Sequence, residues 1–132
     1  MSAPPAESRS DERGATSTEL VIAFPVVLLV ILLAFQFGLY LHAAQIAEAG
    51  AQEAVEAAQG ERAAARHGEA AARRLLRSLG ALRRPQVTVE RTATTATARV
   101  TGHAQQLVPG VSLNILATAE GPVERFVPET TP

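Results

Sequence analysis

The chain divides into four stretches by the pattern of its apolar and polar residues. Residues 1–14 are rich in proline, serine and charge, and residues 20–41 form an apolar run without a charged residue. Residues 43–84 combine alanine with charged side chains, and the segments after Pro85 alternate apolar with polar positions. These patterns predict, in order, a disordered cytoplasmic leader, a membrane helix, an amphipathic helix and a set of strands.

The apolar run is long enough to cross a bilayer. It reads LVIAFPVVLLVILLAFQFGLYL, and its 22 residues rise about 33 Å at ~1.5 Å per residue, close to the ~30 Å of a hydrocarbon layer. A cleaved signal peptide is the alternative, but its apolar region has only about 7 to 15 residues, and no clear small-x-small cleavage site follows a run of this size. We therefore predict a transmembrane helix over residues 15–41.

Charged residues beside the run predict its orientation. Arg9 and Arg13 precede it, whereas residues 42–61 contain no arginine or lysine. Basic residues in short flanking segments tend to remain in the cytoplasm. We therefore expect the N-terminus inside the cell and the residues after position 41 outside it.

The alanine-rich stretch predicts that the helix continues outside the membrane over residues 42–84. Apolar residues recur there at spacings of three, four or seven, which places them on one face of a helix. These positions, which we call the seam, are Ala44, Ala47, Ala51, Ala54, Ala58, Ala65, Ala72, Leu75, Leu79 and Leu82. Because most of them are alanines, the seam buries little area but allows another element to approach closely. Gly80 and Pro85 mark the expected helix end.

Three segments with alternating apolar residues predict a small antiparallel sheet over residues 85–120. They are QVTVER, TATARVTG and SLNILATAE, and their valines and threonines suit half-buried strands. A sheet of this size has too little core to stand alone, so we expect it to pack on the helix end around Leu75, Leu79 and Leu82. Residues 121–132 form a proline-rich tail. The predicted fold class is α+β, with a long N-terminal helix followed by three strands.

Composition argues against most catalytic and ligand-binding functions. The chain has no cysteine and a net charge of -1. His42, His67 and His103 lie far apart without the carboxylate spacing of a metal site, and no motif of a serine hydrolase, phosphate loop or zinc protease is present. The arginines between residues 73 and 84 lack the interleaved aromatics of a nucleic-acid site. We expect no enzymatic activity, cofactor, metal, nucleic acid or small-molecule substrate.

A motif stands at the start of the apolar run. Gly14 is followed by a short polar stretch, Glu19 stands five residues later, and the apolar helix follows. This order resembles the class III signal of type IV pilins, which a prepilin peptidase cuts after the glycine. The sequence RGATSTELVIAFPVVLLVILLAFQFGLYLHAAQIAEAGAQEAV is similar to the TadE family of small pseudopilins of the tight-adherence (Tad/Flp) pilus, and VTGHAQQLVPGVSLNILATAEGPVERF resembles the family's outer domain. The resemblance also implies a pilin-like fold.

The resemblance assigns roles to three residues. Cleavage would separate Gly14 from Ala15, which would become the first residue of the mature chain. Glu19 would then meet the terminal amine of a neighbouring subunit. The alternative interpretation is that Glu19 only favours the positive end of the helix dipole in the first turn. Where many TadE-like sequences have a second glutamate before the Phe37-Gly38 pair, this chain has Gln36.

Pro25 lies within the predicted membrane helix. Its ring removes one backbone donor, so we expect a kink or a local break there. Such a bend would help a subunit leave the membrane, but a proline that the membrane helix merely tolerates fits the sequence equally well.

Taken together, the resemblance implies a minor pseudopilin in a bacterial cell membrane. Its partners would be the membrane, a prepilin peptidase and other pilin-like subunits of the Tad apparatus. Two alternatives stay open. The first is an uncleaved single-pass anchor whose outer domain binds a ligand or acts as a sensor. The second is a secreted domain released by signal peptidase.

Overall fold

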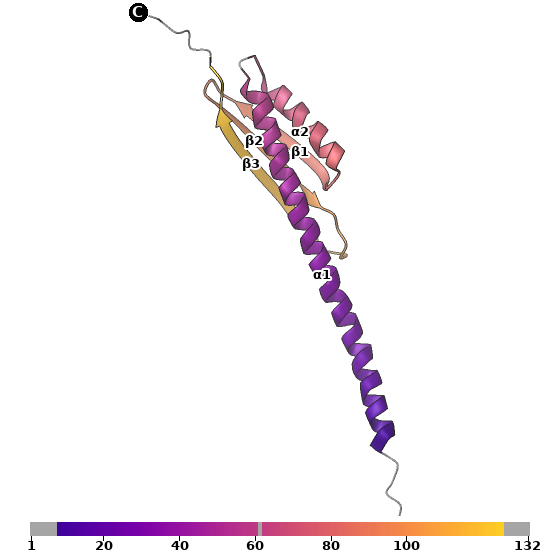
Figure 1. Cartoon of the computed structure of the whole chain (residues 1–132). Coiled ribbons are helices and arrows are strands. Elements are labelled where there is room, and N and C mark those ends of the chain that lie inside the picture. Colours follow the sequence, from indigo (N-terminus) through magenta and orange to yellow (C-terminus); the bar gives the residue numbers. More distant parts are fainter. Residues whose placement is uncertain (1–7, 61, 126–132) are drawn as a thin grey trace, which may run out of the picture. The chain divides into compact units, whose positions relative to one another are not determined.

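The fold is α+β, with one long helix, a shorter second helix and a three-stranded antiparallel sheet (Figure 1). The computed structural model describes residues 8–60 and 62–125, with side chains from Arg13 onward. The elements are α1 (Ser8–Gln59), α2 (Ala65–Leu79), β1 (Leu82–Arg91), β2 (Thr95–Ala104) and β3 (Asn114–Pro122). The chain divides into two compact units between Phe35 and Gln36. The predicted fold class is confirmed, with α2 as an additional element.

The first unit contains the N-terminal part of α1, which exposes apolar side chains on every side. All residues from Leu20 to Ile31 are exposed, and so many consecutive residues cover the full circumference of an α-helix. Leu20 is 68% and Phe24 67% exposed. A helix that is apolar all round is stable only when an apolar medium or partner surrounds it. This part of α1 is long and apolar enough to cross a membrane.

The second unit packs the rest of α1 and α2 on one face of the sheet. The strands run in the order β1-β2-β3, and both neighbouring pairs are antiparallel. One face carries the buried side chains of alternate residues, among them Val87, Val100 and Ile115, and these join the alanines of α1 in a single core. The predicted alternation in the three strands is therefore confirmed, and the unit has two layers.

The seam of α1 brings the two helices unusually close together. Ala47, Ala51, Ala54 and Ala58 are completely buried. A side chain added at Gly68 of α2 would collide with the backbone oxygen of Ala54, so only glycine permits this approach. Small residues at a helix contact allow close packing of the backbones, which compensates for the small area that each methyl group buries.

The prediction of one helix reaching Arg84 is wrong, because the chain turns back after Gln59. Gly60 follows the end of α1, and α2 begins at Ala65. Arg91 of β1 supports this end: its Nε donates to the oxygen of Ala58 at 2.8 Å, and its Nη2 donates to the oxygen of Gly60 at 3.1 Å. A cation that binds the last free carbonyls stabilises a helix C-terminus.

The expected contact between the sheet and three leucines also needs correction. Leu76 is the buried leucine of α2, Leu75 is half-buried, and Leu79 is 49% exposed. Leu82 is buried, but it belongs to β1. The reason is that residues 65–79 form a separate helix, α2, so the spacing of the seam in α1 does not continue through them. This second helix ends at Gly80 in the left-handed conformation (φ 65°), and Leu82 lies beyond that end.

Strand β1 begins before Pro85 instead of after it. Its pairing with β2 shifts between Arg83 and Gln86, so that two residues oppose one and form a β-bulge. Proline lacks the donor that a regular ladder needs, and an edge strand with a bulge accommodates it.

The terminal segments differ in part from their predictions. α1 begins at Ser8, so residues 8–14 of the expected disordered leader are helical. No proline interrupts that segment, and a helix that is already formed extends at little cost. Residues 1–7 of the leader and 126–132 of the tail lie outside the described residues, whereas Gly121 and Pro122 of the tail belong to β3.

Candidate functional site

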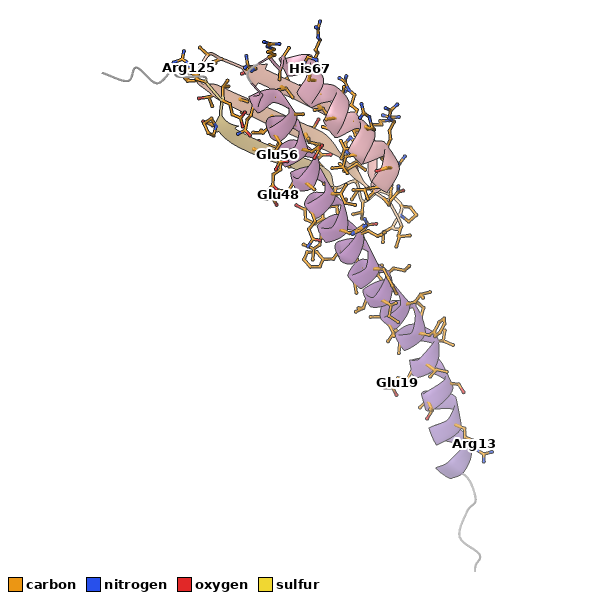
Figure 2. The ribbon with its side chains drawn as sticks, turned by 45° about the horizontal axis from the view of Figure 1, so that its top comes forward. Arg13, Glu19, Glu48, Glu56, His67 and Arg125 are labelled. Carbon is orange, nitrogen blue, oxygen red and sulfur yellow. The ribbon has the colours of Figure 1, made fainter. Side chains whose placement is uncertain are left out.

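The residues that the motif singles out lie together at the start of α1. Arg13, Gly14, Ala15 and Glu19 are exposed and helical, and Figure 2 shows the side chains of Arg13 and Glu19 extending from the helix surface. Ala15 and Glu19 are four residues apart, so they share one face. The structure thus places the predicted first mature residue and the predicted pairing carboxylate on the same side of the helix.

Gly14 is not required by packing. A side chain added there would meet no atom within 4 Å, and its backbone is ordinary helix. Glycine inside a helix costs roughly 1 kcal/mol relative to alanine. A residue that weakens the helix without a steric reason points to a requirement outside the fold, such as recognition by another protein.

Two hydroxyl groups bind the backbone around Gly14. Ser17 Oγ donates to the oxygen of Arg13, and Thr18 Oγ1 donates to the oxygen of Gly14, each at 2.9 Å. Such bonds back to the preceding turn add a second donor to carbonyls that the helix already uses. The carbonyl of the Gly14-Ala15 peptide bond is therefore held within the helix.

Glu19 has no ion-pair partner among the described residues, whose single ion pair joins Arg73 to Glu69 at 3.7 Å. The next residue, Leu20, begins the exposed apolar band. A carboxylate at the edge of a hydrocarbon layer is costly unless it pairs or reaches water. The chain leaves this carboxylate available for a partner from another molecule.

Pro25 does not break the helix, because α1 is helical on both sides of it. Its missing N–H leaves the carbonyl of Val21 without the usual helical donor. The kink predicted at Pro25 stays a prediction.

Gln36 forms an anchor that the sequence pattern did not reveal. Its side chain is only 3% exposed. Its Nε2 donates to the oxygen of Gln105 at 2.8 Å, and its Oε1 accepts from the N–H groups of Leu107 at 2.7 Å and Val108 at 3.3 Å. One amide therefore satisfies three backbone groups of the loop between β2 and β3. A carboxylate could accept two of these bonds but could not make the one that Gln36 donates.

The three histidines have different surroundings. His42 is exposed, and His67 Nδ1 accepts from the N–H of Ala64 at 2.8 Å at the start of α2. His103 is half-buried, and its Nδ1 is buried without a hydrogen-bond partner among the described residues. Within those residues, no three His, Cys, Asp or Glu side chains converge as metal ligands.

Comparison with known proteins finds a family similar to the N-terminal part of the chain. Residues 14–56 match the family model TadE, described as TadE-like protein. The match begins at Gly14 and continues through the apolar band into the seam, so the resemblance inferred from the motif is confirmed there. The later block VTGHAQQLVPGVSLNILATAEGPVERF lies outside the match. No curated protein and no solved structure matches the chain.

Proposed function

We propose that this chain, which is TadE-like over residues 14–56, is a minor pseudopilin that supports assembly of a Tad/Flp-type pilus or secretion apparatus. A prepilin peptidase cuts it after Gly14, and the mature chain begins at Ala15. α1 holds it in the cell membrane with the N-terminus in the cytoplasm. The chain acts as a structural subunit and performs no catalysis.

One observation carries the processing step. The family match starts at Gly14, and Gly14 is a position where the fold has open space for any side chain. Packing therefore gives no reason for a glycine that weakens the helix. A peptidase that accepts only the smallest residue before its cut supplies such a reason.

The position of Glu19 supports the assembly step. Cleavage creates an ammonium on Ala15, on the same helical face as the exposed Glu19 carboxylate. At the membrane edge, where water is scarce, an ammonium of one subunit and a carboxylate of the next pair more strongly than they would in water. The N-terminus of one subunit would then bind the side of α1 of its neighbour through this ion pair.

The second candidate is an uncleaved anchor, and one observation favours it. Residues 8–14 are helical and continuous with the rest of α1, and Thr18 holds the carbonyl of the peptide bond that would be cut. A protease acts on an extended segment, so the helix must open locally before cleavage. The weak helix former Gly14 lowers the cost of that opening.

The mass of the cellular protein separates the two candidates. We expect the intact mass of a chain that begins at Ala15, and we expect Gly14→Phe to retain the leader. Gly38→Phe is the matched control, because Gly38 is also a helical glycine with open space around an added side chain. A wild-type chain that begins at Met1 or Ser2 would contradict the proposal and favour the anchor.

A second variant tests the pairing role by itself. Glu19→Gln keeps the shape of the side chain and removes its charge, so we expect normal processing but loss of crosslinks between α1 helices of neighbouring subunits. Glu48→Gln is the control, since Glu48 is an exposed carboxylate farther along the same helix. Crosslinking that survives in Glu19→Gln would show that the carboxylate is dispensable for assembly.

A further inference from the structure

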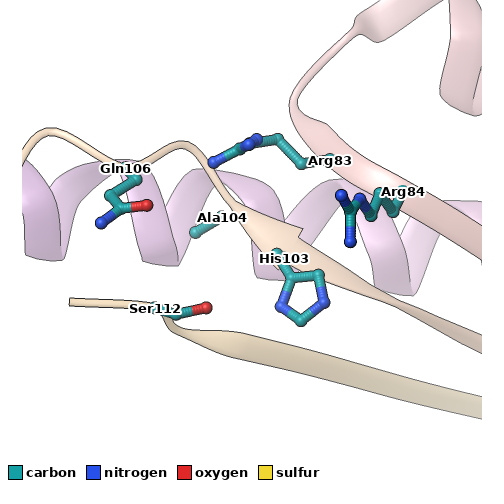
Figure 3. A pocket seen from close by; sticks show the side chains of 6 residues that line it. All are labelled: Arg83, Arg84, His103, Ala104, Gln106 and Ser112. Atoms are coloured by element: carbon teal, nitrogen blue, oxygen red, sulfur yellow. The ribbon is translucent and has the colours of Figure 1, made fainter. Parts of the chain in front are cut away.

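We propose that a hollow beside the β-bulge binds the phosphate of an anionic phospholipid headgroup. Its volume is about 260 Å³, and it is lined by Arg83, Arg84, His103, Ala104, Gln106 and Ser112. Figure 3 shows the two arginines on the β1 side, His103 on β2 and Ser112 ahead of β3. This inference rests on the part of the proposed function that places α1 in a membrane.

The bulge brings two adjacent cations to one site. Consecutive residues of a regular strand point to opposite faces of the sheet. Arg83 and Arg84 nevertheless line the same hollow, because the pairing shifts between Arg83 and Gln86 and Arg84 adopts φ 49°. A positive φ is rare for a residue other than glycine and costs energy, and such strain gathers at functional positions.

The hollow has positive charge without a counterion from its own lining. None of its six lining residues, all within the described part of the chain, is acidic. Residues 61–104 carry nine arginines against three glutamates, an excess of six positive charges in a chain whose net charge is -1. Two guanidinium groups that line one hollow repel each other, and a phosphate would offset this repulsion with charge-assisted hydrogen bonds.

His103, Gln106 and Ser112 add further hydrogen-bonding groups to the site. His103 is paired with Arg83 across the strands, and its buried Nδ1 has no hydrogen-bond partner in the described residues. That nitrogen is therefore a hydrogen-bonding atom of a lining residue that the fold leaves unused. Ser112 and Gln106 bring a hydroxyl and an amide to the same hollow.

The depth of the hollow identifies its occupant. Gln36 belongs to the apolar run that ends at Leu41, and it binds Gln105, Leu107 and Val108. The loop that continues from Ala104 is therefore held beside Gln36, a residue of the apolar run. Leu107 in this loop is 47% exposed, as is suitable for contact with acyl chains. Arginines at this level lie within reach of lipid phosphates, which guanidinium groups bind through charge-assisted hydrogen bonds.

The test uses the full chain in the uncharged detergent dodecyl maltoside, with nitrogen NMR signals of residues 83, 84 and 103 as the readout. Dihexanoyl phosphatidylglycerol is titrated against dihexanoyl phosphatidylcholine and inorganic phosphate. We expect saturable shifts with phosphatidylglycerol. Its binding should be at least about tenfold tighter than the binding of phosphatidylcholine or inorganic phosphate. Arg83→Gln/Arg84→Gln should weaken binding about tenfold to thirtyfold, because each arginine near an anionic lipid contributes separately.

Two further variants test whether the loss of binding depends on the arginines at positions 83 and 84. Arg83→Lys/Arg84→Lys retains the charges and should recover part of the affinity. Arg62→Gln/Arg66→Gln removes two exposed arginines next to the turn at the other end of the helical seam and should change the affinity less than about twofold. Both arginine pairs are exposed, so we expect every variant to fold. Dispersed amide signals in the NMR spectrum of each variant will establish this.

Four results would overturn the inference. They are the absence of shifts, equal binding of inorganic phosphate, equal losses in the Arg62 and Arg66 variant, and lipid-free shifts that grow with protein concentration, which would assign the hollow to a second copy of the chain. Partition of the chain into carbonate-washed membranes is recorded first. A chain that partitions there without preferring phosphatidylglycerol contradicts only this inference, whereas a chain that remains in the aqueous fraction contradicts the membrane role as well.

Discussion

The two halves of α1 differ in which apolar side chains they expose and which they bury. In the N-terminal half, large apolar residues such as Leu20 and Phe24 are exposed, whereas in the C-terminal half the completely buried residues are alanines such as Ala47 and Ala54. A helix of a water-soluble protein buries its largest apolar side chains first. One continuous helix therefore serves two environments: the first half needs an apolar solvent, and the second needs a neighbouring helix close enough to contact methyl groups.

Placing a charge in the lipid-facing half should have the largest effect. Leu28→Arg adds a cation near the middle of the apolar run, and insertion should cost about 2.5–3.5 kcal/mol more. We expect a clear fall in the membrane-bound fraction, measured by carbonate extraction. Leu28→Ala is the control and should remain in the membrane. Equal partition of the arginine variant and the control would mean that Leu28 does not face lipid.

Enlarging a side chain in the packed half should have the next largest effect. Ala58→Leu forces extra atoms against Gly68, because the Cβ of Ala58 lies beside that glycine at the contact of the two helices, and should lower the free energy of unfolding by about 1–3 kcal/mol. The melting temperature by circular dichroism in detergent measures this. Ala49→Leu makes the same change at an exposed position of α1 and should leave the melting temperature nearly unchanged. If both variants melted alike, the close helix contact would be wrong.

Removing the anchor at the junction of the two halves should have a smaller effect. Gln36→Leu leaves backbone groups of Gln105 and Leu107 without their partner, but the buried leucine offsets part of the loss, so we expect a net cost of about 1 kcal/mol. Hydrogen exchange at the amides of Leu107 and Val108 should accelerate. Gln45→Leu, at an exposed position of α1, is the control. Unchanged protection of both amides in Gln36→Leu would show that the anchor does not hold the loop.

Local patterns were sufficient to predict much of this fold. The exposed apolar band follows directly from residues 20–41, and the buried alanines follow from their helical spacing. The three strands follow from the alternation of apolar residues after Pro85. In each case the signal lies within one element, because periodicity reports the face that a helix or strand buries.

The features that sequence reasoning missed depend on contacts between distant residues. α1 ends at Gln59, where Arg91 binds the last carbonyls and Gly68 lets α2 pack back on the seam. Gln36 is buried by a loop some seventy positions later in the chain. Arg83 and Arg84 share a hollow because a bulge changes the strand register. Gly60 follows the end of α1, but Gly50 and Gly68 lie within helices, so the glycines alone do not locate the turn.

The most direct test measures the environment of α1 residue by residue in a bilayer. The chain has no native cysteine, so single cysteines with spin labels can be placed from position 20 to position 58, and collision with oxygen can be recorded by electron paramagnetic resonance. We predict high oxygen accessibility on every side of the helix from 20 to 31, and a period of about 3.6 residues from 43 to 58 with minima at positions 47, 51, 54 and 58. A helical period within 20 to 31, or uniform oxygen accessibility beyond 43, would contradict the account.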